Sequence, residues 1–205
     1  MEQLPKAVPR PGKVQAELAR PRPRIDPAEE DAQPGSNQIG DRLLHAPRTY
    51  LWHHRPVRSV YEATGGSEAI VRLAHAWHVR VLEDEVVSHA FSHGYHPEHT
   101  ERLAAYWIEA LGGPADYSGH LGDETSVVRI HSGNGPHEEM DRRANICFDH
   151  ALADVGLDRD EHVRQVLHDY FSWATTTTMA RYHDSAEDVP DGLSIPHWSW
   201  EGLVG

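Results

Sequence analysis

The chain has 205 residues, of which 39% are hydrophobic and 25% are charged, so it can form one packed domain with additional segments. Its formal net charge of -13 argues against DNA or RNA as a partner, because nucleic-acid affinity comes from clustered lysine and arginine. The lone cysteine, Cys147, excludes an intrachain disulfide and any cysteine-rich metal or iron–sulfur site. No apolar run approaches the ~18 residues of a membrane span, and no secretory signal is evident. We therefore expect a soluble, cytoplasmic protein.

Residues 1–58 differ in composition from the rest of the chain. They hold nine of the 14 prolines and ten Lys plus Arg against seven Asp plus Glu, about +3, which leaves nine against 25, or -16, for residues 59–205. Their start has neither helical nor strand periodicity. We predict a disordered leader over 1–58, a folded domain over 59–183 and an irregular C-terminal extension over 184–205, whose two tryptophans indicate that it packs against the domain.

From residue 59 onward, apolar residues recur three and four positions apart, which predicts an all-helical domain. A short helix over 59–64 should end at the glycine pair 65–66, and Ser67 should be the N-cap of a long helix over 68–83. Pro97 fits the first turn of a further helix, which should end at the glycine pair 112–113.

The second half of the domain follows the same pattern. Residues 115–136 carry four glycines and predict a loop with one turn of helix before His131. A helix should cover 137–154 and end before Gly156. Asp158 has capping-box spacing for the last long helix.

The chain contains 17 histidines, the residues best suited here to bind a metal or transfer a proton. Most are expected at the solvent-exposed surface. No HExxH motif occurs, so a hydrolytic zinc site has little support. Three histidines fall on separate apolar segments: His78 beside Trp77, His99 one turn before Leu103, and His131 directly after an apolar turn. These three can converge in a folded helical domain.

At these residues the chain resembles the group II truncated hemoglobins, over about residues 59–183. The matching segments are Ser59 to Gly66, Leu82 to Val86, Glu101-Arg102-Leu103, Gly112-Gly113-Pro114 and Tyr117-Ser118. His131 falls at the position of the family's proximal heme-ligating histidine, and Cys147 follows at the family's spacing. The resemblance implies a two-over-two helical sandwich that holds heme b, with His131 as the iron ligand.

A heme site needs an axial nitrogen, an apolar slot and polar or cationic groups near the propionates. The candidates for the slot are Trp77, Phe91, Leu103, Trp107, Val128, Ile130, Ala144 and Phe148. Arg129 is the candidate for a propionate partner. Each apolar residue in this set is also compatible with an ordinary place in the helix core, and Arg129 with an ordinary place on the surface.

The departures from the family pattern bear on function. His78 replaces the tyrosine that usually reaches bound oxygen, Phe91 keeps an aromatic ring without the hydroxyl, and Ala144 replaces a tryptophan. Asn134 replaces a phenylalanine on the proximal side. Loss of the indole predicts an open space beside Ala144. The imidazoles of His78 and His99 can each donate a hydrogen bond to bound dioxygen or move a proton near neutral pH, so both are predicted to be catalytic.

We therefore predict a heme-dependent oxidoreductase, peroxidase-like or oxygenating, that binds dioxygen or another diatomic ligand. Its further partners would be an electron donor and a small organic substrate. Two alternatives stay open from the sequence: a non-catalytic oxygen- or NO-binding or sensing globin, and a globin scaffold that has lost heme.

Overall fold

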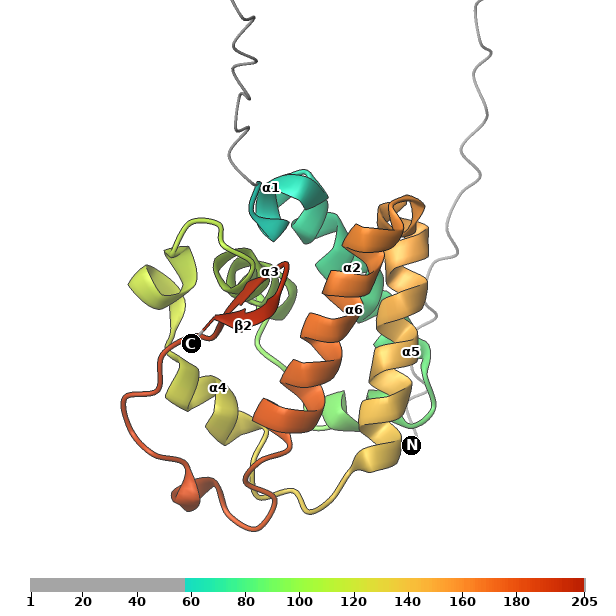
Figure 1. The fold of residues 1–205 in the computed structure, drawn as a ribbon. Helices are drawn as coiled ribbons and strands as arrows, with labels where there is room; N and C mark the ends of the chain where they lie inside the picture. Colours follow the sequence, from blue (N-terminus) through green and yellow to red (C-terminus); the bar gives the residue numbers. More distant parts are fainter. Residues whose placement is uncertain (1–57, 205) are drawn as a thin grey trace, which may run out of the picture. The chain divides into compact units, whose positions relative to one another are not determined.

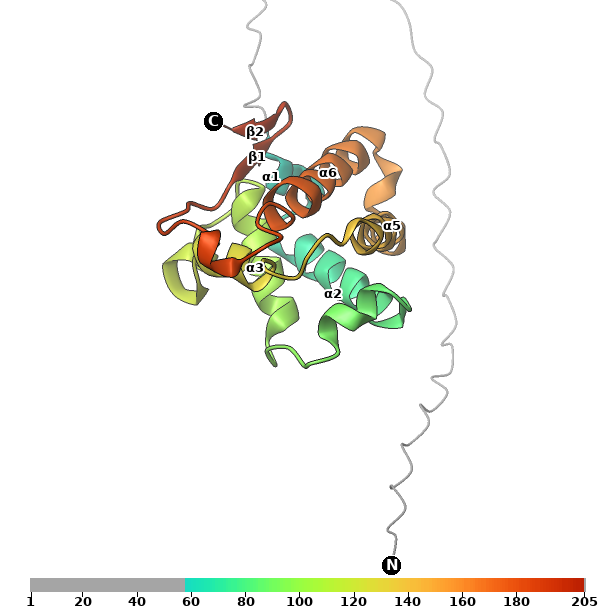
Figure 2. The same cartoon turned by 90° about the horizontal axis from the view of Figure 1, so that it is seen from below.

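The computed structural model describes residues 58–204, so the predicted leader lies outside the described residues except for Arg58. Four long helices form the core of the fold: α2 (Ser67–Glu83), α3 (His99–Ala110), α5 (Glu138–Asp154) and α6 (Glu161–Trp173). Helix α2 packs on both α3 and α5, and α5 packs on α6. Figure 1 shows α5 and α6 side by side, and Figure 2 shows α2 and α3 beside them. This arrangement of two helix pairs confirms the predicted all-α, two-over-two fold.

The first helix, α1 (Val60–Thr64), forms because its ends satisfy their own backbone groups. Ser59 Oγ accepts a hydrogen bond from the Glu62 backbone N–H at 3.1 Å, and the Ser59 N–H donates to the Glu62 carboxylate at 3.0 Å, which is the capping box. Helix α2 starts without the predicted Ser67 cap. The hydroxyl of Ser67 instead shares a hydrogen bond with that of Tyr61, at 3.0 Å.

The connections to α3 and α4 contain more helix than the sequence predicted. The 3-10 helix η1 (Val87–Phe91) follows α2, and α3 begins at His99, so Pro97 lies in the turn before the helix and not within it. The predicted loop over 115–136 contains the π-helical turn η2 (Tyr117–Leu121) and the seven-residue helix α4 (Glu124–Ile130). The Asp123 carboxylate caps α4 by accepting from the Ser126 N–H at 2.9 Å.

The N-cap residue of helix α6 is not the one that the sequence predicted. Asp160, not Asp158, caps α6, because its carboxylate accepts from the N–H groups of His162 and Val163. Asp158 lies within η3 (Leu157–Arg159), a 3-10 turn between the two helices. Helix α6 continues into the π-helical segment η4 (Ala174–Met179).

The centre of the core is an aromatic cluster to which each long helix contributes one ring. Phe148 of α5 stacks on Phe171 of α6 with ring centroids 4.2 Å apart, and Trp107 of α3 meets Phe148 edge-on at 5.5 Å. Trp77 of α2 lies 5.9 Å from Trp107 and 5.6 Å from Phe171. Because all four rings are buried, their packing fixes how the two helix pairs cross.

The C-terminal extension is ordered, as its tryptophans indicated, but it is not wholly irregular. After the 3-10 turn η5 (Ala186–Asp188), strands β1 (His197–Ser199) and β2 (Gly202–Val204) form an antiparallel hairpin. The Trp198 ring packs against Tyr170 and Trp173 at 5.9 and 5.4 Å. Long-range side-chain packing holds this hairpin. Within residues 58–204, no helix is long and apolar enough to cross a membrane.

Candidate heme site

Helices α2 and α3 bring His78 and His99 together, as the sequence predicted. Their ring centroids are 5.0 Å apart, and Phe91 lies 5.4 Å from the first and 5.5 Å from the second. Tyr95 completes the group, 4.9 Å from His78 and 5.6 Å from His99. We call these four rings the distal cluster.

The polar atoms of the distal cluster are incompletely satisfied. His78 Nδ1 lies 2.5 Å from the Thr100 hydroxyl, whereas His78 Nε2 and His99 Nδ1 are buried and have no hydrogen-bond partner within residues 58–204. A buried unpartnered nitrogen costs free energy unless another molecule satisfies it. The pair therefore offers two nitrogen atoms to a bound ligand.

Burial also determines the charge of this pair. It lowers the pKa of His78, and it lowers the pKa of His99 to about 4, with further lowering from the nearby charges of His78 and His131. Both imidazoles are therefore neutral at pH 7. A neutral imidazole has one nitrogen that donates and one that accepts, as ligand recognition and proton transfer require.

Two members of this environment were missed by sequence reasoning. Tyr95 brings a phenol close to the histidine pair, although the sequence predicted a pocket without a tyrosine. It lies in the irregular segment before α3, where no periodicity marks which side chains turn inward. Thr100 is buried; its position next to His99 was the only signal available.

His131, the predicted iron ligand, lies at the C-terminal end of α4. Its Nδ1–H donates to the Val127 carbonyl at 2.8 Å, and because a carbonyl can only accept, this bond leaves Nε2 with a free lone pair. Desolvation by surrounding protein atoms lowers the pKa of His131, and the residue is exposed at the surface of the described residues. His131 is therefore a neutral imidazole at pH 7 that is accessible to a ligand.

Polar groups of α5 and the C-terminal segment lie close to His131. His137 Nδ1 and Asp141 Oδ1 are 2.9 Å apart, and the ring of His183 lies 5.6 Å from that of His137. Burial raises the pKa of Asp141, while the charges of His137, His183 and His131 lower it. The sequence gave no sign of this cluster, because His183 is more than 40 residues from its neighbours.

Three residues predicted for the heme slot belong to the central aromatic cluster: Trp77, Trp107 and Phe148. The Trp77 Nε1–H donates to the Ala144 carbonyl at 3.3 Å, and Ala144 is only 7% exposed. Ala144 is thus buried next to an indole from α2, and the structure gives no support to the predicted open space beside it. Contact of these residues with heme stays a prediction.

The remaining predicted residues lie on α3 and α4. Leu103 is partly buried one turn after His99, and Val128 is buried. Ile130 is 77% exposed, so the structure does not make it part of an apolar slot. The Arg129 guanidinium donates to the Asp191 carboxylate at 2.8 Å and to the Val189 carbonyl at 3.2 Å. Arg129 thus has partners in the C-terminal segment, and its contact with a heme propionate stays a prediction.

The donor set fits a heme group. One neutral imidazole with a free Nε2 lies at the end of the short helix α4, and two neutral imidazoles, each with a nitrogen that is unpartnered within residues 58–204, lie on α2 and α3. An axial nitrogen on one side and hydrogen-bonding groups on the other are what a heme iron with an open ligand position requires. Together with the two-over-two helical arrangement, this set defines a truncated heme protein of the globin class.

Comparison with known proteins identifies the family. The model of the bacterial-like globins matches residues 59–176, so the chain belongs to that family, and the predicted resemblance to truncated hemoglobins is confirmed. Heme, with its iron, is therefore the cofactor, and globins bind dioxygen or other diatomic ligands at it.

Similar solved structures agree on the fold. A thermostable hemoglobin from Thermobifida fusca is 27% identical, with a TM-score of 0.51 over 60% of this chain and 98% of its own. A hemoglobin from Chloroflexus aurantiacus is 25% identical, with a TM-score of 0.51 over 60% and 99%. The group II truncated hemoglobin from Bacillus anthracis, 20% identical with a TM-score of 0.52 over 62% and 95%, shares the fold.

Proposed function

We propose that this globin is a heme-dependent oxidoreductase that reduces or transfers the diatomic ligand that it binds. The main ligand that we propose is dioxygen. The observation that carries this proposal is the pair of imidazoles His78 and His99, each with a buried nitrogen that has no hydrogen-bond partner within residues 58–204. Heme, when bound, supplies the iron that binds the ligand and passes electrons to it. The histidine pair supplies hydrogen bonds and protons on the distal side.

Thr100 suits His78 to proton transfer. A threonine hydroxyl can donate or accept, so the bond of 2.5 Å between Thr100 Oγ1 and His78 Nδ1 is compatible with either neutral tautomer of the imidazole. His78 Nε2 can therefore release or take up a proton while Nδ1 stays hydrogen-bonded. Tyr95, 47% exposed, lies between this pair and solvent and offers a hydroxyl through which a proton can return.

Electrons must come from outside the chain. Reduction of dioxygen to peroxide consumes two electrons and two protons, so the reaction requires an electron donor. Because Trp77 lies against Ala144, the structure gives no support to a substrate held beside Ala144, and we assign the reducing substrate to a surface encounter. A reducing cytoplasm, where a buried free thiol such as Cys147 persists, is the setting that we propose.

The test measures how fast the ferrous, heme-loaded protein oxidises in air between pH 5 and 8, and how fast it oxidises a reducing dye with peroxide. His78→Phe and His99→Leu should each slow these reactions by about 100-fold, the usual effect of losing a positioned acid–base group. The matched control is His93→Gln, which changes an exposed histidine in the turn between η1 and α3 and should change neither rate. Rates that are unaffected by both distal substitutions would show that the histidine pair is not catalytic.

The second candidate is a non-catalytic gas-binding globin, and the Thr100 bond also favours it, because a fixed imidazole stabilises a bound ligand. The same experiment distinguishes the two by sign. In a carrier, the unaltered protein oxidises slowly, and His78→Phe accelerates oxidation by removing a stabilising hydrogen bond.

The role of His131 as the iron ligand has its own test. His131→Ala should abolish or greatly weaken heme retention, measured by the Soret band and the pyridine hemochrome, because the bond from iron to this nitrogen is the only covalent tether expected in a heme b protein. Unchanged heme content would refute the assignment.

A further inference from the structure

We propose that the C-terminal segment Tyr182–Leu193 is a positioning strap, which holds helix α4 in place and thereby sets the position of His131. The inference rests on the proposed role of His131 as the iron ligand. In Figure 1 this segment, which follows α6 and η4, runs past α4 before it reaches the hairpin. The region matched by the family model ends at residue 176, so the strap lies outside the shared globin domain.

One face of α4 is hydrogen-bonded to the strap along its length. The Thr125 hydroxyl donates to the Pro190 carbonyl at 3.2 Å and accepts from the Leu193 N–H at 3.1 Å. One turn later, the Arg129 guanidinium donates to the Asp191 carboxylate at 2.8 Å. Residues four apart share a helix face, so Thr125 and Arg129 together fix both the rotation and the position of α4.

The strap also holds the chain directly after His131. The Gly133 N–H donates to the Tyr182 carbonyl at 2.9 Å, and the Gly135 N–H donates to the His183 carbonyl at 3.0 Å. Gly133 has a φ of +73°, and a Cβ there would lie 3.2 Å from the Ala186 backbone nitrogen. Glycine is therefore needed for this close approach. The strap contacts the backbone or side chains on both sides of His131 in the sequence.

Helix α4 depends on such contacts because it is short. Seven residues make less than two turns, and a helix of this length is not stable in water by itself. Val128 of α4 and Val189 of the strap are both buried, and the Val189 carbonyl accepts from the Arg129 guanidinium at 3.2 Å. The bond from His131 Nδ1 to the Val127 carbonyl couples the imidazole to the helix, so displacement of α4 displaces Nε2.

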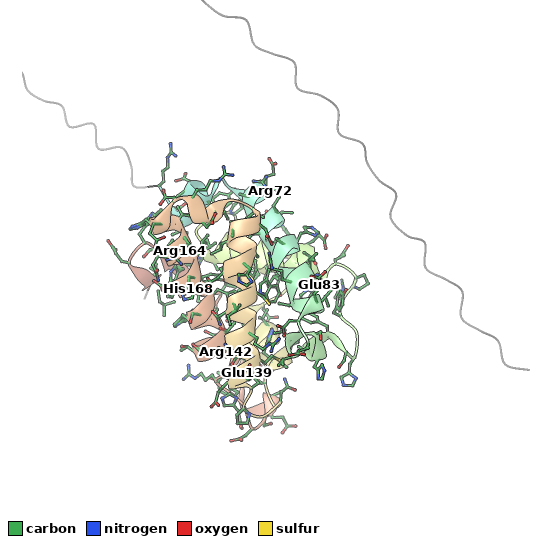
Figure 3. All side chains as sticks on the ribbon, turned by 90° about the vertical axis from the view of Figure 1, so that its right-hand side faces the viewer. Arg72, Glu83, Glu139, Arg142, Arg164 and His168 are labelled. Carbon is green, nitrogen blue, oxygen red and sulfur yellow. The ribbon has the colours of Figure 1, made fainter. Side chains whose placement is uncertain are left out.

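The experiment uses the full, heme-loaded chain with substitutions that remove the strap contacts. Thr125→Val keeps the shape of the side chain and removes its two hydrogen bonds, Thr125→Ser restores the hydroxyl, and Asp191→Asn removes a carboxylate that is 91% exposed. Glu139→Gln is the control, because it weakens an exposed ion pair with Arg142 on α5; Figure 3 shows both residues on that helix.

Two measurements report on the bond between His131 and the heme iron. Transfer of hemin to apomyoglobin should be roughly tenfold faster for Thr125→Val and roughly threefold faster for Asp191→Asn, as expected from the loss of about two hydrogen bonds and one exposed pair. The iron–histidine stretching band of the ferrous protein should shift or broaden in both variants. It should return to its original position in Thr125→Ser and stay unchanged in Glu139→Gln.

The proposal is wrong if Thr125→Val and Asp191→Asn lose hemin no faster than the control. It is also wrong if they only lower the melting temperature and leave the iron–histidine band unchanged, because the strap would then stabilise the fold without positioning the ligand. His131→Ala in the same transfer assay separates the two proposals. If His131→Ala retains hemin, the assignment of His131 as the iron ligand is wrong. If His131→Ala loses hemin quickly while Thr125→Val and Asp191→Asn retain it, the iron ligand stands and only the strap proposal is wrong.

Discussion

Glu124, the first residue of α4, is a buried carboxylate whose ionisation should oppose folding. It is 3% exposed, and it accepts a hydrogen bond of 2.8 Å from the Tyr106 hydroxyl. Burial raises the pKa of Glu124 from its ordinary value of 4.5 to about 6, although the Tyr106 bond lowers it. Glu124→Gln keeps an oxygen that can accept this bond and removes the ionisable group.

The magnitude follows from the difference in pKa between the folded and unfolded chains. Because the folded state binds this proton more tightly, the contribution of Glu124 to stability is complete below pH 4.5 and is lost as the pH rises through 6. A shift from 4.5 to about 6 in pKa corresponds to about 1.5–2 kcal/mol. The unfolding free energy of Glu124→Gln, relative to the unaltered protein, should therefore rise by about this amount between pH 4.5 and 7.5, or by about 3–8 °C in Tm.

The assay is chemical unfolding of the heme-loaded protein, followed by circular dichroism at several pH values within this range. The control is Glu139→Gln on the exposed surface of α5, where the Arg142 guanidinium lowers the pKa of the carboxyl, so its relative stability should not rise with pH. An offset between Glu124→Gln and the unaltered protein that is independent of pH would refute the reasoning.

Three further predictions concern packing and charge. Phe148→Ala should lower the unfolding free energy by about 3–5 kcal/mol in denaturant titration, because the ring is 1% exposed and stacks on Phe171 at 4.2 Å. Gly113→Ala should lower it by about 1–3 kcal/mol, because a Cβ would lie 2.8 Å from the Ile108 carbonyl oxygen; a melting temperature equal to that of the unaltered protein would contradict this. The pKa of His99 is lowered to about 4, so the unfolded chain takes up this proton between pH 6.5 and 4 and the folded protein loses stability as the pH falls. In His99→Leu, the loss of unfolding free energy on acidification should therefore be smaller by up to about 3 kcal/mol. Unfolding at pH 7 and pH 4.5 tests this, and an unchanged difference between the two would show that His99 is not the group responsible.

The helices and their order could be predicted from the sequence, because helix formation depends on residues within four positions of one another. The short helix before the glycine pair 65–66 was predicted, and the capping box of Ser59 and Glu62 that starts it in the structure is such a local signal. The pairing of His78 with His99 was predictable from the family resemblance, since both lie on long periodic helices. The sequence predicted Asp158 as the cap of α6, whereas Asp160 caps that helix in the structure.

The contacts that complete the site were decided only by the tertiary structure. Tyr95 joins the histidine pair from a segment with no periodicity. Trp77 is hydrogen-bonded to Ala144, 67 positions later in the sequence, and Arg129 binds Asp191, 62 positions later. None of these distances in sequence leaves a local pattern. Such contacts arise when packed helices bring surfaces together, and which side chains meet depends on how the helices cross. The sequence by itself therefore determined the helices and the histidines, whereas the surroundings of those histidines depended on the packing of the whole domain.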